Sequence, residues 1–255
     1  MYGTMSNMTL ERAAMVTQRN SLLGAPFSVI KKHFENANNI PSGLDYKGKA
    51  LKKVMQWDAI AYLIANVANA MEGTVFGGFI TSHLSGFLTS DIDLLWDSTS
   101  QLLSFKQSIL HFICMVFELD QTMLDMTVVE ESGYAHKHMI SIRFATDFTF
   151  KIKVDMTLRK KSTKGLFVPI TYGRNLAYNY VDGFHNKMTR YELPKKIPIN
   201  LIMDKLQQGK DIWLIVPKMT TFLTNPQKET YNLYVKERTE KVIGYGFEMG
   251  PVPLV

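Results

Sequence analysis

The stretch VFGGFITSHLSGFLTSDIDLLW, residues 75–96, decides how the rest of the chain is interpreted. It begins as a short apolar strand, turns at Gly77 and Gly78, continues with helical spacing and ends in a second strand, residues 91–96. Side chains alternate along a strand, so Asp91 and Asp93 share one face, with Cα atoms about 6–7 Å apart. Two carboxylates this close repel unless a cation lies between them, and oxygen ligands favour Mg²⁺ or Mn²⁺.

The same stretch offers groups that could bind phosphate. Gly77 and Gly78 allow a ligand to approach the backbone closely, and the helix that follows presents free N–H groups at its N-terminus. A third acid, Asp155, lies in a strand with Lys151 and Lys153 just upstream. Each feature alone is typical of turns and caps, but together they predict a metal and phosphate site.

Outward from this stretch, the pattern predicts an α/β (α+β) protein with a mixed sheet flanked by helices and helical additions at each end. The expected helices are 9–23, 26–37, 49–71, 79–87, 99–119, 199–208 and 227–241, and further strands are expected at 126–131, 138–144, 148–158 and 211–216. We expect an N-terminal helical region (1–72), a core (73–183) and a C-terminal α/β extension (184–255).

Composition limits the class of protein. With 46% hydrophobic and 20% charged residues among 255, the chain is in the globular range. Cys114 is the single cysteine, so an internal disulfide is excluded and a reducing compartment is expected. The longest apolar stretch, residues 109–119, is shorter than a bilayer span, and the N-terminal residues lack a signal-peptide pattern. We therefore expect a cytoplasmic protein without a membrane partner.

Charge is concentrated in one segment. The net charge is +6, yet the segment from Lys151 to Lys196 holds eleven basic and three acidic residues. Such an excess fits a polyanion, either nucleic acid or a nucleoside triphosphate. A solvated basic face is the alternative.

These residues resemble the signature of the DNA polymerase β-type nucleotidyltransferase superfamily. The twelve residues between Gly78 and Asp91, with Gly86 among them, are closest in spacing to the heads of bacterial-type CCA-adding enzymes and poly(A) polymerases. VDMTLR (154–159) resembles the strand that carries the third acid, and NLAYNYVDG (175–183) is similar to a downstream segment. INLIMDKLQQGK (199–210) and ERTEKVIGYGFEM (237–249) are more weakly similar to nucleotidyltransferase-like proteins of large DNA viruses, which would act in the host cytoplasm.

The resemblance implies a nucleotidyltransferase core and two-metal phosphoryl transfer from a nucleoside triphosphate to a hydroxyl. It implies that Asp91, Asp93 and Asp155 are the catalytic residues and ligate Mg²⁺ or Mn²⁺. The implied nucleotide-binding residues are Gly77, Gly78, Thr81, Ser82, Lys151, Lys153 and Arg159. Tyr172, Tyr178 and Tyr180 are candidates for base stacking.

Three functions remain open at this point. The acceptor is most simply a nucleic-acid 3′ hydroxyl, and RNA is expected because the basic excess lies on and beyond the third acidic strand. The acceptor could instead be a protein or small molecule, as in toxin-like or antibiotic-modifying relatives. The third alternative is a catalytically silent binding module. No oligomeric state is predicted.

Overall fold

The computed structural model describes residues 8–131, 135–144, 148–158, 170–172, 178–180, 204, 206–209, 224–244 and 246–248. In chain order the elements are α1 (Leu10–Asn20), α2 (Phe27–Ala37), β1 (Asp45–Tyr46), β2 (Lys49–Ala50), α3 (Leu51–Ala70), β3 (Thr74–Phe76), α4 (Gly78–Ser85), β4 (Asp91–Trp96), α5 (Thr99–Phe117), η1 (Gln121–Met123), β5 (Leu124–Glu131), β6 (Ala135–Phe144), β7 (Phe148–Leu158), β8 (Ile170–Tyr172), β9 (Tyr178–Tyr180) and α7 (Asn225–Gly244).

A mixed sheet organises the fold. Its order is β5-β6-β7-β4-β3, continued by the short strands β8 and β9. The pair β4–β7 is parallel and the other neighbouring pairs of this sheet are antiparallel. A separate two-stranded hairpin, β1–β2, precedes α3. The expected α/β class and mixed sheet are confirmed.

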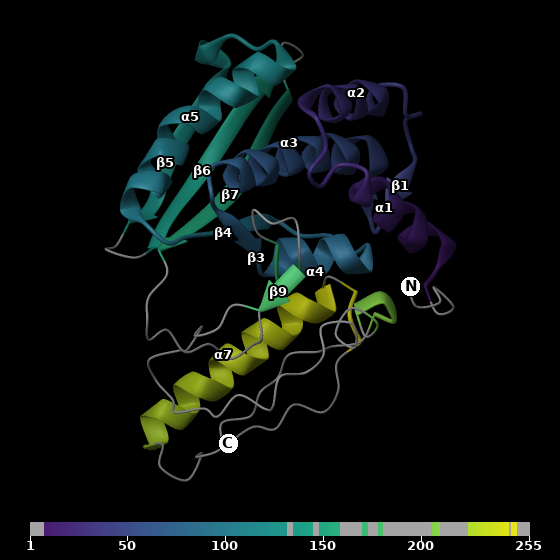
Figure 1. The fold of residues 1–255 in the computed structure, drawn as a ribbon. Helices are drawn as coiled ribbons and strands as arrows, with labels where there is room; N and C mark the ends of the chain where they lie inside the picture. Colours follow the sequence, from purple (N-terminus) through teal and green to yellow (C-terminus); the bar gives the residue numbers. More distant parts are fainter. Residues whose placement is uncertain are drawn as a thin grey trace.

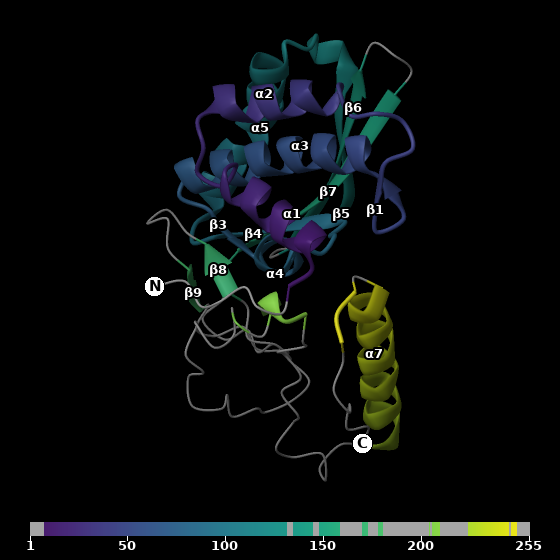
Figure 2. The same ribbon diagram turned by 90° about the vertical axis from the view of Figure 1, so that its right-hand side faces the viewer.

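Helices α3 and α5 cover one face of this sheet (Figure 1). Alternation along β4 and β7 turns Ile92, Leu94, Ile152 and Val154 toward these helices, and each of the four is fully buried. Helix α3 is apolar on almost all sides, which is typical of a helix enclosed by other elements. Its outer side is covered by α2 (Figure 2), so residues before and after position 72 share one hydrophobic core.

Described residues of the C-terminal part contact α1 and the segment that follows α4. The Arg12 guanidinium donates to the carbonyls of Leu206 at 3.2 Å and Gln207 at 3.0 Å. Phe247 packs on Phe87 with ring centroids 4.5 Å apart. Residues 206–209 and 246–248 thereby lie against the end of the core formed by α1 and the segment after α4. The helix expected at 227–241 is confirmed as α7, whereas the strand expected at 211–216 lies outside the described residues.

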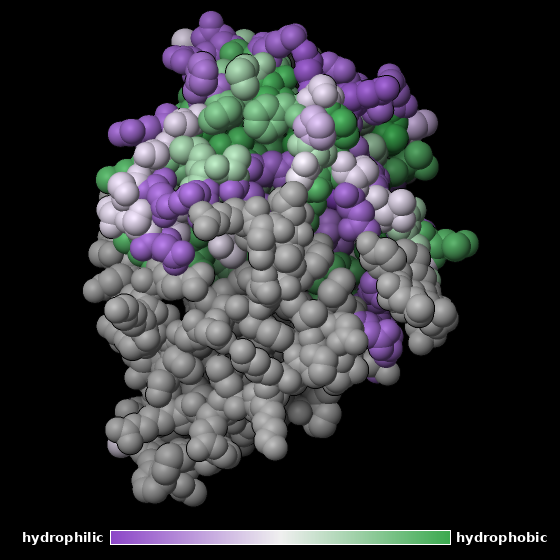
Figure 3. Space-filling view, in the orientation of Figure 1, coloured by the Kyte–Doolittle hydropathy of each residue, from purple (hydrophilic) through white to green (hydrophobic). Residues whose placement is uncertain are grey.

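In the orientation of Figure 1, the surface over α2, α3 and α5 carries both apolar and hydrophilic side chains (Figure 3). In the part of the chain that the structure describes, no helix is long and apolar enough to span a bilayer.

Candidate active site

A tight turn joins β3 to α4. Gly77 has φ +69° and ψ −143°, a backbone conformation that L side chains rarely adopt. A Cβ at this position would lie 2.2 Å from Oδ2 of Asp93, so the turn also requires a residue without a side chain. The N–H of Gly78 donates to the same Oδ2 at 3.3 Å. The glycine turn and the DxD strand are therefore in direct contact.

The three predicted acids are carried by neighbouring parallel strands in register. Asp93 of β4 lies opposite Asp155 of β7, and Asp91 lies opposite Lys153. The side chains of Asp91, Asp93, Lys153 and Asp155 consequently lie on the sheet face opposite to α3 and α5, which we call the acidic face. The Asp91 and Asp155 side chains are only 11% and 19% exposed, and the hydroxyl of Thr89 donates to Asp91 Oδ1 at 3.4 Å.

Lys153 neutralises part of this acidic group. Its Nζ lies 2.9 Å from Asp155 Oδ2 and 3.8 Å from Asp91 Oδ2. Partial burial of the ammonium works to lower the pKa of Lys153. The hydrogen bond to Asp155 and the charges of Asp155, Asp91 and Asp93 outweigh burial and raise that pKa above its ordinary value. The charged Lys153 ammonium therefore lies among the carboxylates and pairs with Asp155 and Asp91.

The residues fit a hard divalent cation by chemistry. Asp155 Oδ1 is buried and has no hydrogen-bond partner in the structure, which is costly for a carboxylate oxygen unless a cation or donor reaches it. Carboxylate oxygens are the ligands that Mg²⁺ and Mn²⁺ prefer. Among the described residues, however, no three His, Cys, Asp or Glu side chains are grouped closely enough to form a ligand set, and Lys153 contacts two of the acids.

Thr81 and Ser82 of α4 have different surroundings. The half-buried Thr81 hydroxyl donates to the Gly78 carbonyl at 3.0 Å, which keeps it beside the turn. Ser82 is 2% exposed, donates to the Phe87 carbonyl and accepts from Arg19 Nη1 at 3.1 Å. The Ser82 hydroxyl thus belongs to a buried network, whereas the Thr81 hydroxyl contacts the glycine turn.

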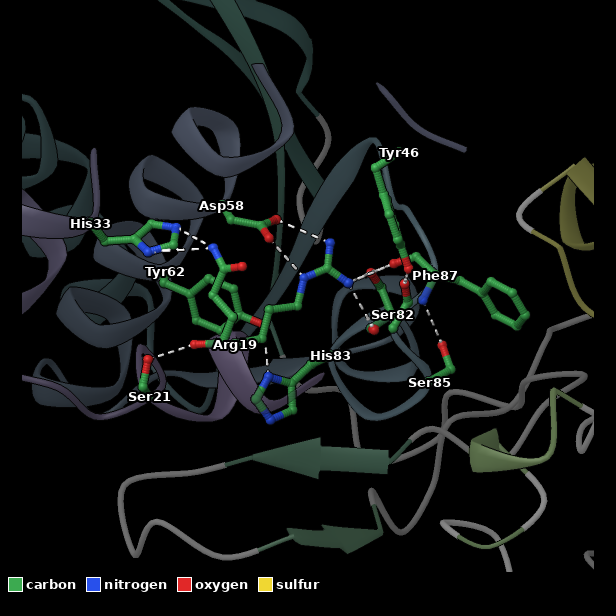
Figure 4. A network of polar contacts seen from close by, with 12 residues as sticks. Arg19, Ser21, His33, Tyr46, Asp58, Tyr62, Ser82, His83, Ser85 and Phe87 are labelled. Atoms are coloured by element: carbon green, nitrogen blue, oxygen red, sulfur yellow. Dashed lines mark hydrogen bonds and ion pairs between the residues drawn. The ribbon is translucent and has the colours of Figure 1, made fainter. Parts of the chain in front are cut away.

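That network is a feature that the sequence interpretation missed (Figure 4). Arg19 forms two hydrogen bonds to Asp58, at 2.8 and 3.1 Å, and donates to the carbonyls of Ser82 at 3.0 Å and Phe87 at 2.6 Å. Both partners of the ion pair are almost fully buried. The available signal was the charge of Asp58 inside the otherwise apolar run of α3, because buried charges are normally paired.

His83 extends the buried network toward α3. Its Nδ1 lies 2.7 Å from the Tyr62 hydroxyl. Burial, helped by the charge of Arg19, lowers the pKa of His83 to about 3, so this imidazole stays neutral. It packs in the core beside the turn and takes no part in the acidic face.

The remaining predicted residues lie apart or outside the described structure. Lys151 is exposed on β7, two residues before Lys153. Tyr172, Tyr178 and Tyr180 belong to β8 and β9, where Tyr172 pairs with Val75 and Tyr178, but their side chains are outside the described set. Arg159 also lies outside the described residues. The structure therefore brings together Gly77, Gly78, Thr81, Asp91, Asp93, Lys153 and Asp155.

Similarity of this chain to known proteins is found among solved structures. No protein-family model matches the chain, and no curated protein matches it. A solved structure, JHP933 from Helicobacter pylori, is similar with a TM-score of 0.36 and 9% identity, over 76% of this chain and 78% of that one.

Proposed function

We propose that the protein is a metal-dependent nucleotidyltransferase: a hydroxyl attacks the α-phosphate of a nucleoside triphosphate, the nucleoside monophosphate is transferred to its oxygen, and pyrophosphate is released. One observation carries the proposal: the Gly77–Gly78 turn contacts Asp93, while Asp155 lies in register with Asp93 on the neighbouring parallel strand. A surface turn would explain the glycines alone, and a strand cap would explain a single acid alone. Neither explains a glycine turn in contact with a strand whose face carries three acids together with the neighbouring strand.

In this proposal Asp91, Asp93 and Asp155 hold Mg²⁺ or Mn²⁺, which would stabilise the attacking and leaving oxygens. Gly78 begins α4, so the first N–H groups of this helix and the Thr81 hydroxyl can contact phosphate oxygens. Lys153 has a raised pKa and stays charged, so it can neutralise phosphate once it leaves Asp155. Asp155 would accept the proton of the attacking hydroxyl.

The proposed acceptor is an RNA 3′ hydroxyl. Lys151 and Lys153 open the basic segment 151–196, and both lie on the strand that carries Asp155. Positive charge that continues from the third acid suits a chain of phosphates better than a small neutral acceptor.

The test is transfer of label from each radiolabelled triphosphate, with Mg²⁺ or Mn²⁺, to a mixed pool of RNA and DNA. The wild type is compared with Asp91→Asn/Asp93→Asn and with Asp125→Asn, an exposed carboxylate on β5 that serves as the matched control. We expect transfer to RNA by the wild type and the control, and loss of at least ~100-fold in the double variant. Label in the protein itself would favour a protein-modifying enzyme.

A second function has one observation in its favour. Lys153 already supplies a positive charge to Asp155 and Asp91, as a fold that no longer binds a metal would require. In that case the protein is a catalytically silent binding module. Absence of label in every acceptor, with triphosphate binding intact, would support the module and overturn the enzyme.

A further inference from the structure

A cavity lies beside the acidic face, at the point where β4 begins. β7 pairs with β6 from Phe148 onward, but its pairing with β4 starts only at Lys153, opposite Asp91. Among the described residues, no strand therefore pairs with the β4-facing edge of β7 between Thr149 and Lys151. Residues 88–90 and the first turns of α3 close this gap into a cavity of about 500 Å³. This volume is within the range of small-molecule sites.

The charged residues that line the cavity leave it positive. Lys49, Lys53 and Lys151 line it, together with the buried pair Arg19–Asp58. Among the described lining residues Asp58 is the one carboxylate, and both of its oxygens accept hydrogen bonds from Arg19. Lys49, Lys53 and Lys151 add positive charge to this described lining. Their convergence favours an anionic ligand, in particular one that carries phosphate.

The apolar residues add a second requirement. Lys53 and Trp57 are four residues apart on α3, so they lie on the same helix face, and both border the cavity. Val54, Leu88 and Phe150 complete the apolar part of the lining. A half-buried indole next to ammonium groups suits a ligand with a flat ring and a phosphate.

We propose that this cavity binds a nucleoside phosphate, with the base against Trp57 and the phosphate among Lys49, Lys53 and Lys151. The inference rests on the proposed function, because it assigns this second site to the acceptor side of the reaction. Ser90 of the lining precedes Asp91 directly, and Lys151 lies on the same strand face as Lys153 and Asp155. Thr89 also lines the cavity and donates to Asp91 Oδ1, so a nucleotide held here would lie next to that carboxylate.

The experiment measures binding to the full-length chain in EDTA, so that neither metal nor transfer is needed. The probes are AMP, adenosine and a six-nucleotide RNA, and isothermal titration calorimetry measures the affinity of each. The site variant is Lys49→Gln/Lys53→Gln, and the matched control is Lys32→Gln/Lys52→Gln, two exposed lysines of α2 and α3 outside the cavity. Thermal unfolding verifies that both variants are folded.

We expect AMP to bind the wild type and the control equally and the site variant at least about tenfold more weakly. Adenosine should bind more weakly than AMP by a similar factor. Displacement of AMP by the RNA identifies the ligand as the terminal nucleotide of a strand, whereas AMP binding that RNA does not affect identifies a free nucleotide. Trp57→Leu should weaken AMP binding as well.

Equal AMP affinity in the site and control variants, or no AMP and no RNA binding to the wild type, would overturn the inference. These outcomes separate it from the proposed function. Label transfer by the wild type, together with AMP affinity that is equal in the site and control variants, would reject the cavity site and leave the proposed enzyme standing. AMP binding at the cavity in a chain that transfers no label rejects the enzyme alone.

Discussion

At the residue scale, Gly77 is constrained by its backbone and by its neighbour. Its φ of +69° disfavours any L side chain, and Asp93 Oδ2 occupies the space that a Cβ would need. We expect Gly77→Ala to destabilise the fold by more than the ~1–2 kcal/mol of left-handed strain, because the Asp93 carboxylate must also move.

Gly48→Ala is the matched control for this prediction. Gly48 has φ +74° with open space around its Cβ position, so only backbone strain should appear. Urea unfolding of the two variants provides the comparison. Equal losses of unfolding free energy would contradict the contact between the turn and Asp93.

His83 gives a pH dependence with a definite sign. Its pKa is about 3 in the folded protein and about 6.5 in an unfolded chain. Between these values the unfolded chain binds a proton that the folded chain does not. Stability should therefore fall as pH decreases from about 6.5 toward 3, by up to ~1.4 kcal/mol per pH unit from this group.

His83→Gln should flatten that part of the stability curve, and His111→Gln, on an exposed helix position, should leave it unchanged. Urea unfolding at a series of pH values measures both curves. A His83→Gln curve parallel to the wild type would show that another group carries the dependence.

At the element scale, the register of β4 and β7 sets Lys153 among the acids. A divalent cation must compete with this ammonium for oxygens of Asp155 and Asp91. We expect Lys153→Met to bind Mn²⁺ several-fold more tightly, and Lys151→Met, with an exposed lysine on the same strand, to bind it as the wild type does. Titration with Mn²⁺, followed by electron paramagnetic resonance, measures the affinities. Weaker Mn²⁺ binding by Lys153→Met would contradict this competition.

Elements with clear periodicity could be predicted from the sequence. The strand–turn–helix–strand order of residues 75–96, the long helix expected at 49–71 and the strand 148–158 are confirmed with small shifts at their ends. The β1–β2 hairpin was missed because each strand has two residues, too few for alternation to be visible.

The candidate site was predicted from residues that are local in sequence and from the resemblance, which added the distant residues Lys153 and Asp155. Spacing brought Gly78, Asp91 and Asp93 together, and the contact between Gly78 and Asp93 agrees with it. The position of Ser82 depends on Arg19, a residue 63 positions away, and the position of Lys153 depends on strand register. Neither contact has a signal in the local pattern.

At the scale of the whole molecule, the Arg19–Asp58 pair joins α1 to α3 and, through Ser82, to α4. Removing one partner of a buried ion pair leaves an uncompensated charge. We therefore expect Asp58→Asn to cost about 3–5 kcal/mol of unfolding free energy. Chemical denaturation is the measurement.

Glu118→Gln is the control for a pair near the surface. Glu118 is paired with Lys31, and its side chain is 75% exposed, so solvent screens the interaction and little change is expected. Similar losses in Asp58→Asn and Glu118→Gln would contradict the structural role of the buried pair.

The proposal that three carboxylates on one sheet face perform nucleotidyl transfer is tested most directly by the rate of label transfer by Asp155→Asn. In this variant the amide oxygen can still accept from Lys153, while the negative charge is lost. Asp125→Asn is the control, with the same chemical change at an exposed strand position. We expect a loss of at least ~100-fold in Asp155→Asn and none in the control. Transfer by Asp155→Asn at the wild-type rate would show that Asp155 is not a catalytic residue.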